Sequence, residues 1–239
     1  MPFRFRIPAS PDRAQSRSYG KVRLGVQFAA LMTLISLLVF GAGVRAQAET
    51  PIKIVALGDS LTAGFGLPAD AAFPAKLQRA LRTRGIVAEI VNAGVSGDTA
   101  SGGLARLDWS LPEATDAVIL ELGANDALRG IDPKVTHAAL ENILRRLKER
   151  RIEVLLAGMQ APRNLGPDYA AAFDGIFPQL ALTHNVLFYP FFLEGVATDS
   201  KLNQPDGLHP TAAGIDMIVA RILPKVEELV ARVRAKRNS

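Results

Sequence analysis

Residues 52–62 read IKIVALGDSLT, an apolar and β-branched run that ends in a glycine, a carboxylate and a serine. Such a run is typical of a strand buried inside a parallel sheet. The polar residues then fall at the carboxyl edge of that sheet, which is where ligands bind in open α/β folds. Ser60 therefore lies where a nucleophile is useful, provided that another part of the chain supplies a base to take its proton.

The rest of the chain, from residue 51 to about residue 234, alternates short apolar runs with amphipathic helical patterns. We expect five strands, at residues 52–57, 87–91, 117–122, 153–157 and 186–188. This alternation predicts one α/β domain, a three-layer α/β/α sandwich with a five-stranded, mostly parallel sheet. A final helix is expected from near Pro210, with Pro224 kinking or dividing it. Every loop that follows a strand then opens onto the same edge as Ser60.

The net charge of +5 over 239 residues is unevenly distributed along the chain. The first 48 residues carry seven Lys or Arg residues against a single acid, Asp12, so the remainder is close to neutral. Nucleic acid is therefore not an expected partner. The chain contains no cysteine, which excludes disulfides and thiol chemistry.

Residues 1–48 have the form of a secretory signal peptide. A basic region precedes an apolar run at residues 28–40, and Ala46-Gln47-Ala48 matches an A-x-A cleavage site. We expect cleavage after Ala48 and export to the periplasm or the medium, with residues 49–239 as the mature domain and no stable membrane insertion. The alternative is an uncleaved membrane anchor, because residues 24–44 are long enough to span a bilayer.

The candidate base is His209, which stands in a turn-rich loop just before the final helix. Asp206 precedes it by three residues, a spacing that lets the carboxylate reach one imidazole nitrogen while the other points elsewhere. An aspartate in this position orients a catalytic histidine and favours the imidazolium that forms. A simple loop hydrogen bond or a metal pair would use the same residues, so the pattern gains weight only together with Ser60.

Donors for an oxyanion are offered by the loops after the second and third strands. Residues 92–99 read NAGVSGDT, and their glycines let backbone N–H groups approach a ligand closely. Residues 121–126 read ELGAND and place the amide of Asn125 at the same edge. Each loop alone would be interpreted as an ordinary turn. Four loops that converge on one edge favour a site.

These blocks resemble the SGNH (GDSL) hydrolases, and within them the exported bacterial esterases of thioesterase, lysophospholipase and arylesterase type. The resemblance covers essentially the whole body of the chain and rests on residues 58–61 (GDSL), Gly97, residues 123–126 (GAND) and residues 206–210 (DGLHP). Residues 96–99, 102–107 and 190–193 extend it. The resemblance implies a flavodoxin-like sheet and an SGNH hydrolase domain over residues 49–239, with no metal and no cofactor.

Carried over position by position, the resemblance also implies a role for each site residue. Ser60 would be the nucleophile and His209 the base, with Asp206 orienting the histidine. The oxyanion hole would be formed by the backbone N–H groups of Ser60 and Gly97 and by the side chain of Asn125.

The expected function is a serine esterase that hydrolyses carboxylic ester and thioester bonds of small-molecule acyl substrates. Leu165, in the loop after the fourth strand, and Phe192 are candidate substrate-binding residues that favour fatty or aryl acyl groups, although both are also compatible with a place in the core. One alternative is an esterase that removes acetyl or other small acyl groups from carbohydrates. A non-enzymatic alternative is an exported α/β protein that binds a solute.

Overall fold

The carboxyl ends of five parallel strands are the feature on which the fold is built. The structure, a computed structural model, describes residues 1, 3 and 50–239, and residues 50–239 form one compact unit. The predicted signal peptide and its alternative as a membrane anchor fall on residues 1–48, outside the described domain. Within the described part of the chain no helix is long and apolar enough to cross a bilayer.

The sheet confirms the predicted α/β architecture. Its strands are β1 (Ile52–Gly58), β2 (Ala88–Gly94), β3 (Ala117–Glu121), β4 (Glu153–Ala157) and β5 (Leu187–Tyr189). They lie in the order β2-β1-β3-β4-β5, and every neighbouring pair is parallel. The direction of strand order reverses between β1 and β3, which makes their carboxyl ends the point where a ligand is expected in this topology.

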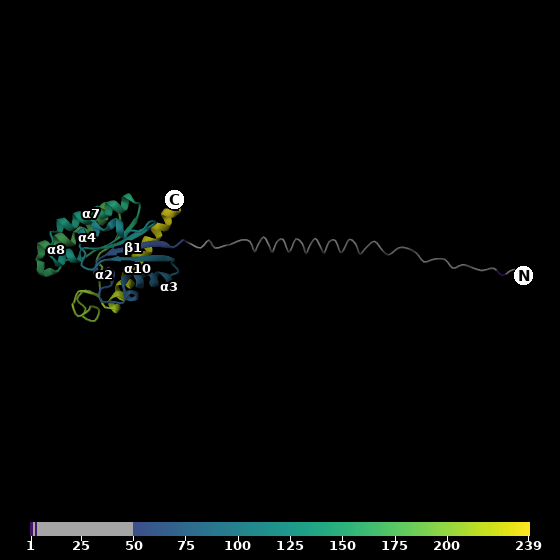
Figure 1. Cartoon of the computed structure of the whole chain (residues 1–239), viewed down its shortest axis with the longest axis horizontal. Helices are drawn as coiled ribbons and strands as arrows, with labels where there is room; N and C mark the ends of the chain where they lie inside the picture. The colour runs from purple at the N-terminus through teal and green to yellow at the C-terminus, as the bar shows by residue number, and fades with distance from the viewer. Residues whose placement is uncertain (2, 4–49) are drawn as a thin grey trace. The chain divides into compact units, whose positions relative to one another are not determined.

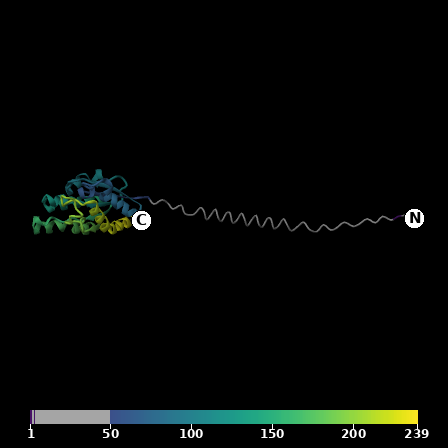
Figure 2. The same ribbon diagram turned by 90° about the horizontal axis from the view of Figure 1, so that it is seen from below.

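Helices cover both faces of the sheet (Figure 1). One layer contains α4 (Ala100–Ala105), α7 (Pro133–Glu149), α8 (Pro167–Asp174) and α9 (Ile176–His184), and the other contains α3 (Phe73–Thr83) and α10 (Ala212–Arg237). Figure 2 looks onto this second layer, where α3 in blue and α10 in yellow lie side by side. The short helices α2 (Ser60–Ala63), α5 (Leu107–Ser110) and α6 (Ala124–Leu128) belong to the connections.

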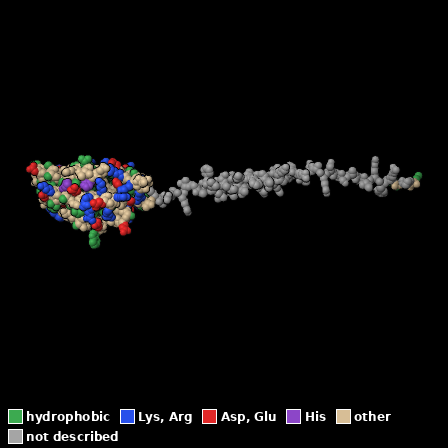
Figure 3. Space-filling view, turned by 90° about the horizontal axis from the view of Figure 1, so that it is seen from above, with side chains coloured by type: hydrophobic (Ala, Val, Ile, Leu, Met, Phe, Trp, Pro, Cys, Tyr) green, Lys and Arg blue, Asp and Glu red, His purple; other side chains and the backbone are tan. Residues whose placement is uncertain are grey.

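The core explains why these segments form a sandwich. All five residues of β3 are buried, and β1 is buried except at Lys53, as the unbroken apolar runs predict for strands covered on both faces. The helices contribute apolar stripes, such as Leu140, Leu144 and Leu147 of α7, which are at most 1% exposed. Figure 3 shows an outer surface of the domain on which basic and acidic side chains are interspersed. Ion pairs from α7 contribute to this surface, including Arg145 with Glu149 and Arg146 with Asp108.

The end of β2 and the course of the last helix differ from the sequence prediction, whereas the other strand boundaries agree with it to within one residue. β2 continues to Gly94 instead of ending at residue 91, because β1 runs to Gly58 and pairs with it in register to that point. Of the two effects expected of Pro224, a kink or a division of the last helix, the division is wrong, since α10 is one helix from Ala212 to Arg237. Its buried residues on both sides of the proline, such as Ile222 and Val226, keep it packed against the domain.

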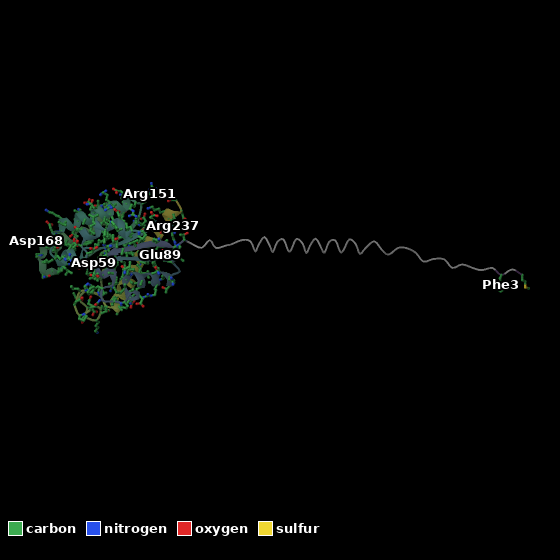
Figure 4. The ribbon with its side chains drawn as sticks, viewed as in Figure 1. Phe3, Asp59, Glu89, Arg151, Asp168 and Arg237 are labelled. Atoms are coloured by element: carbon green, nitrogen blue, oxygen red, sulfur yellow. The ribbon has the colours of Figure 1, made fainter. Side chains whose placement is uncertain are left out.

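The end of α10 lies at the amino-terminal edge of the sheet, opposite the carboxyl edge. Arg237 donates hydrogen bonds to the carbonyl oxygens of Thr50 and Pro51 and forms an ion pair with Asp116, at 2.7 Å between Nη2 and Oδ2. Figure 4 shows Arg237 toward one end of the sheet and Asp59 toward the other. The start of β1 and the end of the last helix are thereby held together.

Candidate active site

Ser60 lies at the turn between β1 and α2. Asp59 is the N-cap of α2, and its Oδ1 accepts the N–H of Leu61 at 2.9 Å. A Cβ atom at position 58 would lie 2.1 Å from Oγ1 of Thr62, so only glycine lets the chain leave the strand this tightly. Ser60 is 9% exposed and lines a cavity, and its N–H belongs to the first turn of the helix, where no intrahelical acceptor exists.

The predicted partners of Ser60, which are His209 and Asp206, lie close to it although they are far from it in the sequence. Nε2 of His209 lies 2.9 Å from Oγ of Ser60, and Nδ1 of His209 lies 2.6 Å from Oδ2 of Asp206. The other carboxylate oxygen of Asp206 accepts the N–H groups of Leu208 and His209 at 2.9 and 3.0 Å. The N–H and imidazole of His209, together with the N–H of Leu208, lower the pKa of Asp206 to about 2. Asp206 is therefore ionised at neutral pH.

Gly97 and Asn125 lie in the loops that follow the neighbouring strands. Gly97 has a φ of +85°, which favours glycine, and its carbonyl accepts a hydrogen bond from Nη2 of Arg129 at 2.8 Å. Asn125 is in α6, lines the same cavity as Ser60 and His209, and donates from Nδ2 to Oδ2 of Asp59 at 3.1 Å. One of the two amide hydrogens of Asn125 remains for another acceptor.

Two buried carboxyl groups lie beneath the nucleophile. Asp59 and Glu121 are both 0% exposed. Oε2 of Glu121 accepts the hydroxyl of Thr62 at 2.7 Å and the N–H of Asp59 at 3.4 Å, whereas Oε1 has no hydrogen-bond partner among the described residues. Burial raises the pKa of Glu121 well above its ordinary value and raises the pKa of Asp59 to about 6. Burial therefore favours the neutral, protonated form of Glu121.

A cavity of about 470 Å³ opens beside these groups. Ser60, Asn125 and His209 form its polar end, and apolar side chains form most of the remaining wall, among them Leu128, Met159, Pro162, Phe191, Leu193 and Leu208. Such a cavity suits an apolar group attached to a polar reacting centre. A second cavity, of about 310 Å³, lies near the amino end of β4 and contains none of the predicted site residues.

The two candidate substrate-binding residues are not part of this cavity wall. Phe192 is fully buried and packs edge-on against Phe73, with ring centroids 5.0 Å apart. Its neighbours Phe191 and Leu193 line the cavity instead, because successive side chains of this segment point in different directions. Leu165 is half-buried in a 3₁₀ turn, and the preceding residues, 161–163, reach the cavity.

No group of three or more His, Asp or Glu side chains within the described domain could hold a metal ion. Among the residues that the structure describes, the hydrogen-bonded Asp206 and His209 thus have no third His, Asp or Glu placed to share a metal ion with them.

Comparison with known proteins agrees with this geometry. Residues 56–216 match the GDSL-like lipase/acylhydrolase family. The chain belongs to this family. It is 39% identical over 181 residues to an arylesterase of Vibrio mimicus, a match that covers 75% of this chain and 90% of the relative. It is 38% identical over 187 residues to thioesterase 1/protease 1/lysophospholipase L1 of Escherichia coli strain K12, covering 78% of this chain and 88% of the relative.

Solved structures of GDSL/SGNH enzymes share the fold. AlinE4, an SGNH-hydrolase family esterase, is 46% identical with a TM-score of 0.64, over 75% of this chain and 96% of that chain. A crystal structure of TesA is 36% identical with a TM-score of 0.71, over 74% and 99%. The predicted family, fold class and enzyme class, a serine hydrolase of ester bonds, are confirmed, and the alternative of a solute-binding protein is set aside.

Proposed function

We propose that this GDSL hydrolase cleaves carboxylic esters and thioesters with Ser60 as nucleophile, His209 as general base and Asp206 as the residue that orients the base. The observation that carries the proposal is the continuous line from Asp206 through His209 to Ser60, with contacts of 2.6 and 2.9 Å. The 2.9 Å distance lies within the range in which Ser60 can pass its proton to His209, and the 2.6 Å contact with Asp206 holds the imidazole in place for that transfer.

The first half of the reaction forms an acyl-enzyme. Oγ of Ser60 bonds to the acyl carbon while its proton passes to Nε2 of His209, and the carbonyl electron pair moves onto oxygen. The ionised Asp206 stabilises the imidazolium that results. The tetrahedral intermediate then collapses, the bond to the leaving alcohol or thiol breaks, and His209 returns its proton to that group.

The negative oxygen of the intermediate needs donors that are already in place. We assign this role to the N–H groups of Ser60 and Gly97 and to the second amide hydrogen of Asn125. None of these donors adds a charge that would hold a ground-state anion. In the second half, water attacks the acyl carbon while His209 removes its proton. The bond between the acyl carbon and Oγ of Ser60 then breaks, His209 returns the proton to Oγ, and the carboxylic acid product is released.

The shape and lining of the cavity favour fatty or aryl acyl groups. A wall dominated by residues such as Met159, Phe191 and Leu193 stabilises apolar chains by burial. The names of the relatives, an arylesterase and a thioesterase/lysophospholipase, support the same class of substrate. An enzyme for acetylated carbohydrate would need polar side chains to hold sugar hydroxyls. The wall offers some, such as Gln160, Arg163 and Thr198, but they are outnumbered by apolar residues, so this enzyme is the second candidate.

A panel of substrates separates these candidates. We expect kcat/KM for p-nitrophenyl esters to rise from acetate to medium-chain acyl groups, with acyl-CoA thioesters also cleaved. Faster release of acetate from acetylated sugars than from any p-nitrophenyl ester would favour the carbohydrate esterase.

Covalent labelling tests the assignment of the nucleophile. A fluorophosphonate should label the wild-type protein on the peptide that contains Ser60, because only an activated serine reacts with it. Ser60→Ala should lose both the label and nearly all esterase turnover while its thermal unfolding stays unchanged. The control Ser101→Ala, at an exposed serine of α4, should retain both. A wild-type protein that is not labelled at Ser60 would refute the proposal.

We also propose that the protein is exported, with cleavage after Ala48 and residues 49–239 as the mature enzyme. The A-x-A site at residues 46–48 supports this. Amino-terminal sequencing of protein from the periplasmic fraction or the medium should begin at Glu49, whereas full-length protein in the membrane fraction would indicate the anchor.

A further inference from the structure

The ring of Phe65 lies against the imidazole of His209. Their ring centroids are 4.4 Å apart and the ring planes are tilted by 34°. Phe65 follows the nucleophile by five residues and is 49% exposed, whereas the side chain of His209 is only 18% exposed. The phenyl ring thus covers part of the proposed base while its own other parts remain open to solvent.

The backbone of Phe65 is fixed to both halves of the site. Its N–H donates to the carbonyl of Ser60 at 3.1 Å, and its own carbonyl accepts Nε2 of Gln204 at 2.7 Å. The same Nε2 donates to the carbonyl of Pro210 at 3.0 Å, and the backbone N–H of Gln204 donates to the carbonyl of His209 at 2.7 Å. Gln204 therefore ties the loop that carries the nucleophile to the loop that carries the base.

Gly66 makes this close approach possible. Its φ is +72°, and a Cβ atom there would lie 2.3 Å from Oε1 of Gln204. Any other residue would push Gln204 away from the carbonyl of Phe65. The turn after α2 is thus shaped around the Gln204 side chain.

We propose that Phe65, held in place by Gln204, is a positioning residue for His209. The ring keeps the imidazole in line between Asp206 and Ser60, and its negative face attracts the imidazolium that forms when Ser60 attacks. Because the histidine becomes a cation only as the reaction proceeds, the attraction is stronger in the transition state than in the ground state and raises kcat. This inference rests on the proposed function.

Two substitutions of Phe65 and one control test the role of the ring. Phe65→Leu keeps an apolar side chain and removes the aromatic face, whereas Phe65→Tyr keeps the face. We expect Phe65→Leu to lower kcat about two- to five-fold with KM nearly unchanged, and Phe65→Tyr to restore it. Trp109→Leu removes an aromatic ring that is 92% exposed on α5 and should leave both constants unchanged.

Any one of three results would overturn the inference. The first is an unchanged kcat in Phe65→Leu, and the second is a loss of kcat in Phe65→Tyr equal to that in Phe65→Leu. The third is a rise in KM alone, which would make Phe65 part of the substrate-binding wall. Thermal unfolding of each variant checks that the fold is retained.

A double substitution tests whether Gln204 acts through Phe65. Gln204→Ala alone should lower kcat, and Phe65→Leu combined with Gln204→Ala should be no slower than the more affected single variant. If the losses of kcat in the two single variants multiply in the double variant, Gln204 acts independently of Phe65, which would contradict the inference.

The labelling rate separates this inference from the proposed function. If the fluorophosphonate labels Ser60 in the wild-type protein and labels Phe65→Leu more slowly, both stand. Equal rates in the two proteins overturn only the role of Phe65, whereas a wild-type protein without label overturns the proposed function itself.

Discussion

The side-chain amide of Asn125 donates a hydrogen bond to the buried carboxylate of Asp59, 3.1 Å away. Asp59 also accepts the N–H of Leu61 at the start of α2. One carboxylate therefore fixes both the helix that presents Ser60 and the amide that faces the cavity. The orientation of the proposed oxyanion donor depends on Asp59.

Removal of the side-chain amide of Asn125 should show directly how much it contributes to kcat. We expect Asn125→Ala to lower kcat by about 10²–10³, the usual effect of losing one oxyanion donor, with a small change in KM. Steady-state kinetics with a p-nitrophenyl ester measures this. Asn142→Ala, at a half-buried asparagine of α7 whose side chain bonds only within its own helix, to the carbonyl of Ala138 and Nη2 of Arg145, is the matched control and should keep wild-type kinetics. A loss below ten-fold in Asn125→Ala would remove Asn125 from the oxyanion hole.

The raised pKa of Asp59 predicts a dependence of stability on pH. The folded protein holds a proton on Asp59 up to about pH 6, whereas the unfolded chain releases it near pH 4. The folded state therefore binds more protons between these values, and the free energy of unfolding should fall as the pH rises from 4 to 6, by on the order of 2–3 kcal/mol.

Urea unfolding of the wild-type protein and of Asp59→Asn at several pH values between 4 and 7 measures this contribution. The variant has no titrating group at position 59, so its free energy of unfolding should decline less over this range. The remaining decline is assigned to Glu121, whose pKa is also raised and whose proton is likewise released earlier in the unfolded chain. Parallel curves for the two proteins would contradict the shift at Asp59.

Glu121 should tolerate replacement by its uncharged analogue. Burial favours the protonated form of the Glu121 carboxyl group, and in that form Glu121→Gln exchanges one neutral side chain for another of the same size. We expect the free energy of unfolding at pH 7 to change by less than about 1.5 kcal/mol, whereas Glu121→Ala should lose more, since it leaves a void and removes the acceptor of the Thr62 hydroxyl. A gain of several kcal/mol in Glu121→Gln would mean that a buried charge had been removed.

Asp206 should be sensitive to a change that preserves its shape. In Asp206→Asn an amide replaces the carboxylate, so the imidazolium loses its counter-charge and the histidine is no longer held in the productive tautomer. We expect kcat to fall by up to about 10⁴ without loss of fold. Asp199→Asn, at an exposed aspartate earlier in the same loop, is the control. Near-wild-type turnover in Asp206→Asn would contradict the assignment.

The sheet and the positions of the site loops could be predicted from the sequence because both follow from local pattern. Strands buried on both faces must be apolar throughout, so residues 52–57 and 117–122 stand out, and parallel strands must deliver their loops to one edge. The meeting of Ser60 with His209 follows from this topology together with the motifs. Gly97 and Asn125 lie in the expected loops for the same reason.

The cavity wall and the contacts of Phe65 could not be predicted because they depend on the direction of single side chains. Phe191 and Phe192 are equivalent in sequence, yet the former lines the cavity and the latter packs against Phe73 in the core. Gln204 and Phe65 are 139 positions apart and carry no motif of their own. The one signal in the sequence was Gly66, because a glycine shortly after the nucleophile indicates a position where a side chain would not fit.

The contacts of Arg237 with Thr50, Pro51 and Asp116 have a practical consequence for handling the enzyme. Because they join the end of α10 to the start of β1, a linker attached beyond α10 leaves the domain at the pole far from Ser60. Immobilising the enzyme on a solid support through such a linker should leave the cavity beside Ser60 facing the substrate solution. The end of α10 and the start of β1 could also be joined to each other, so that new termini are opened elsewhere on the surface.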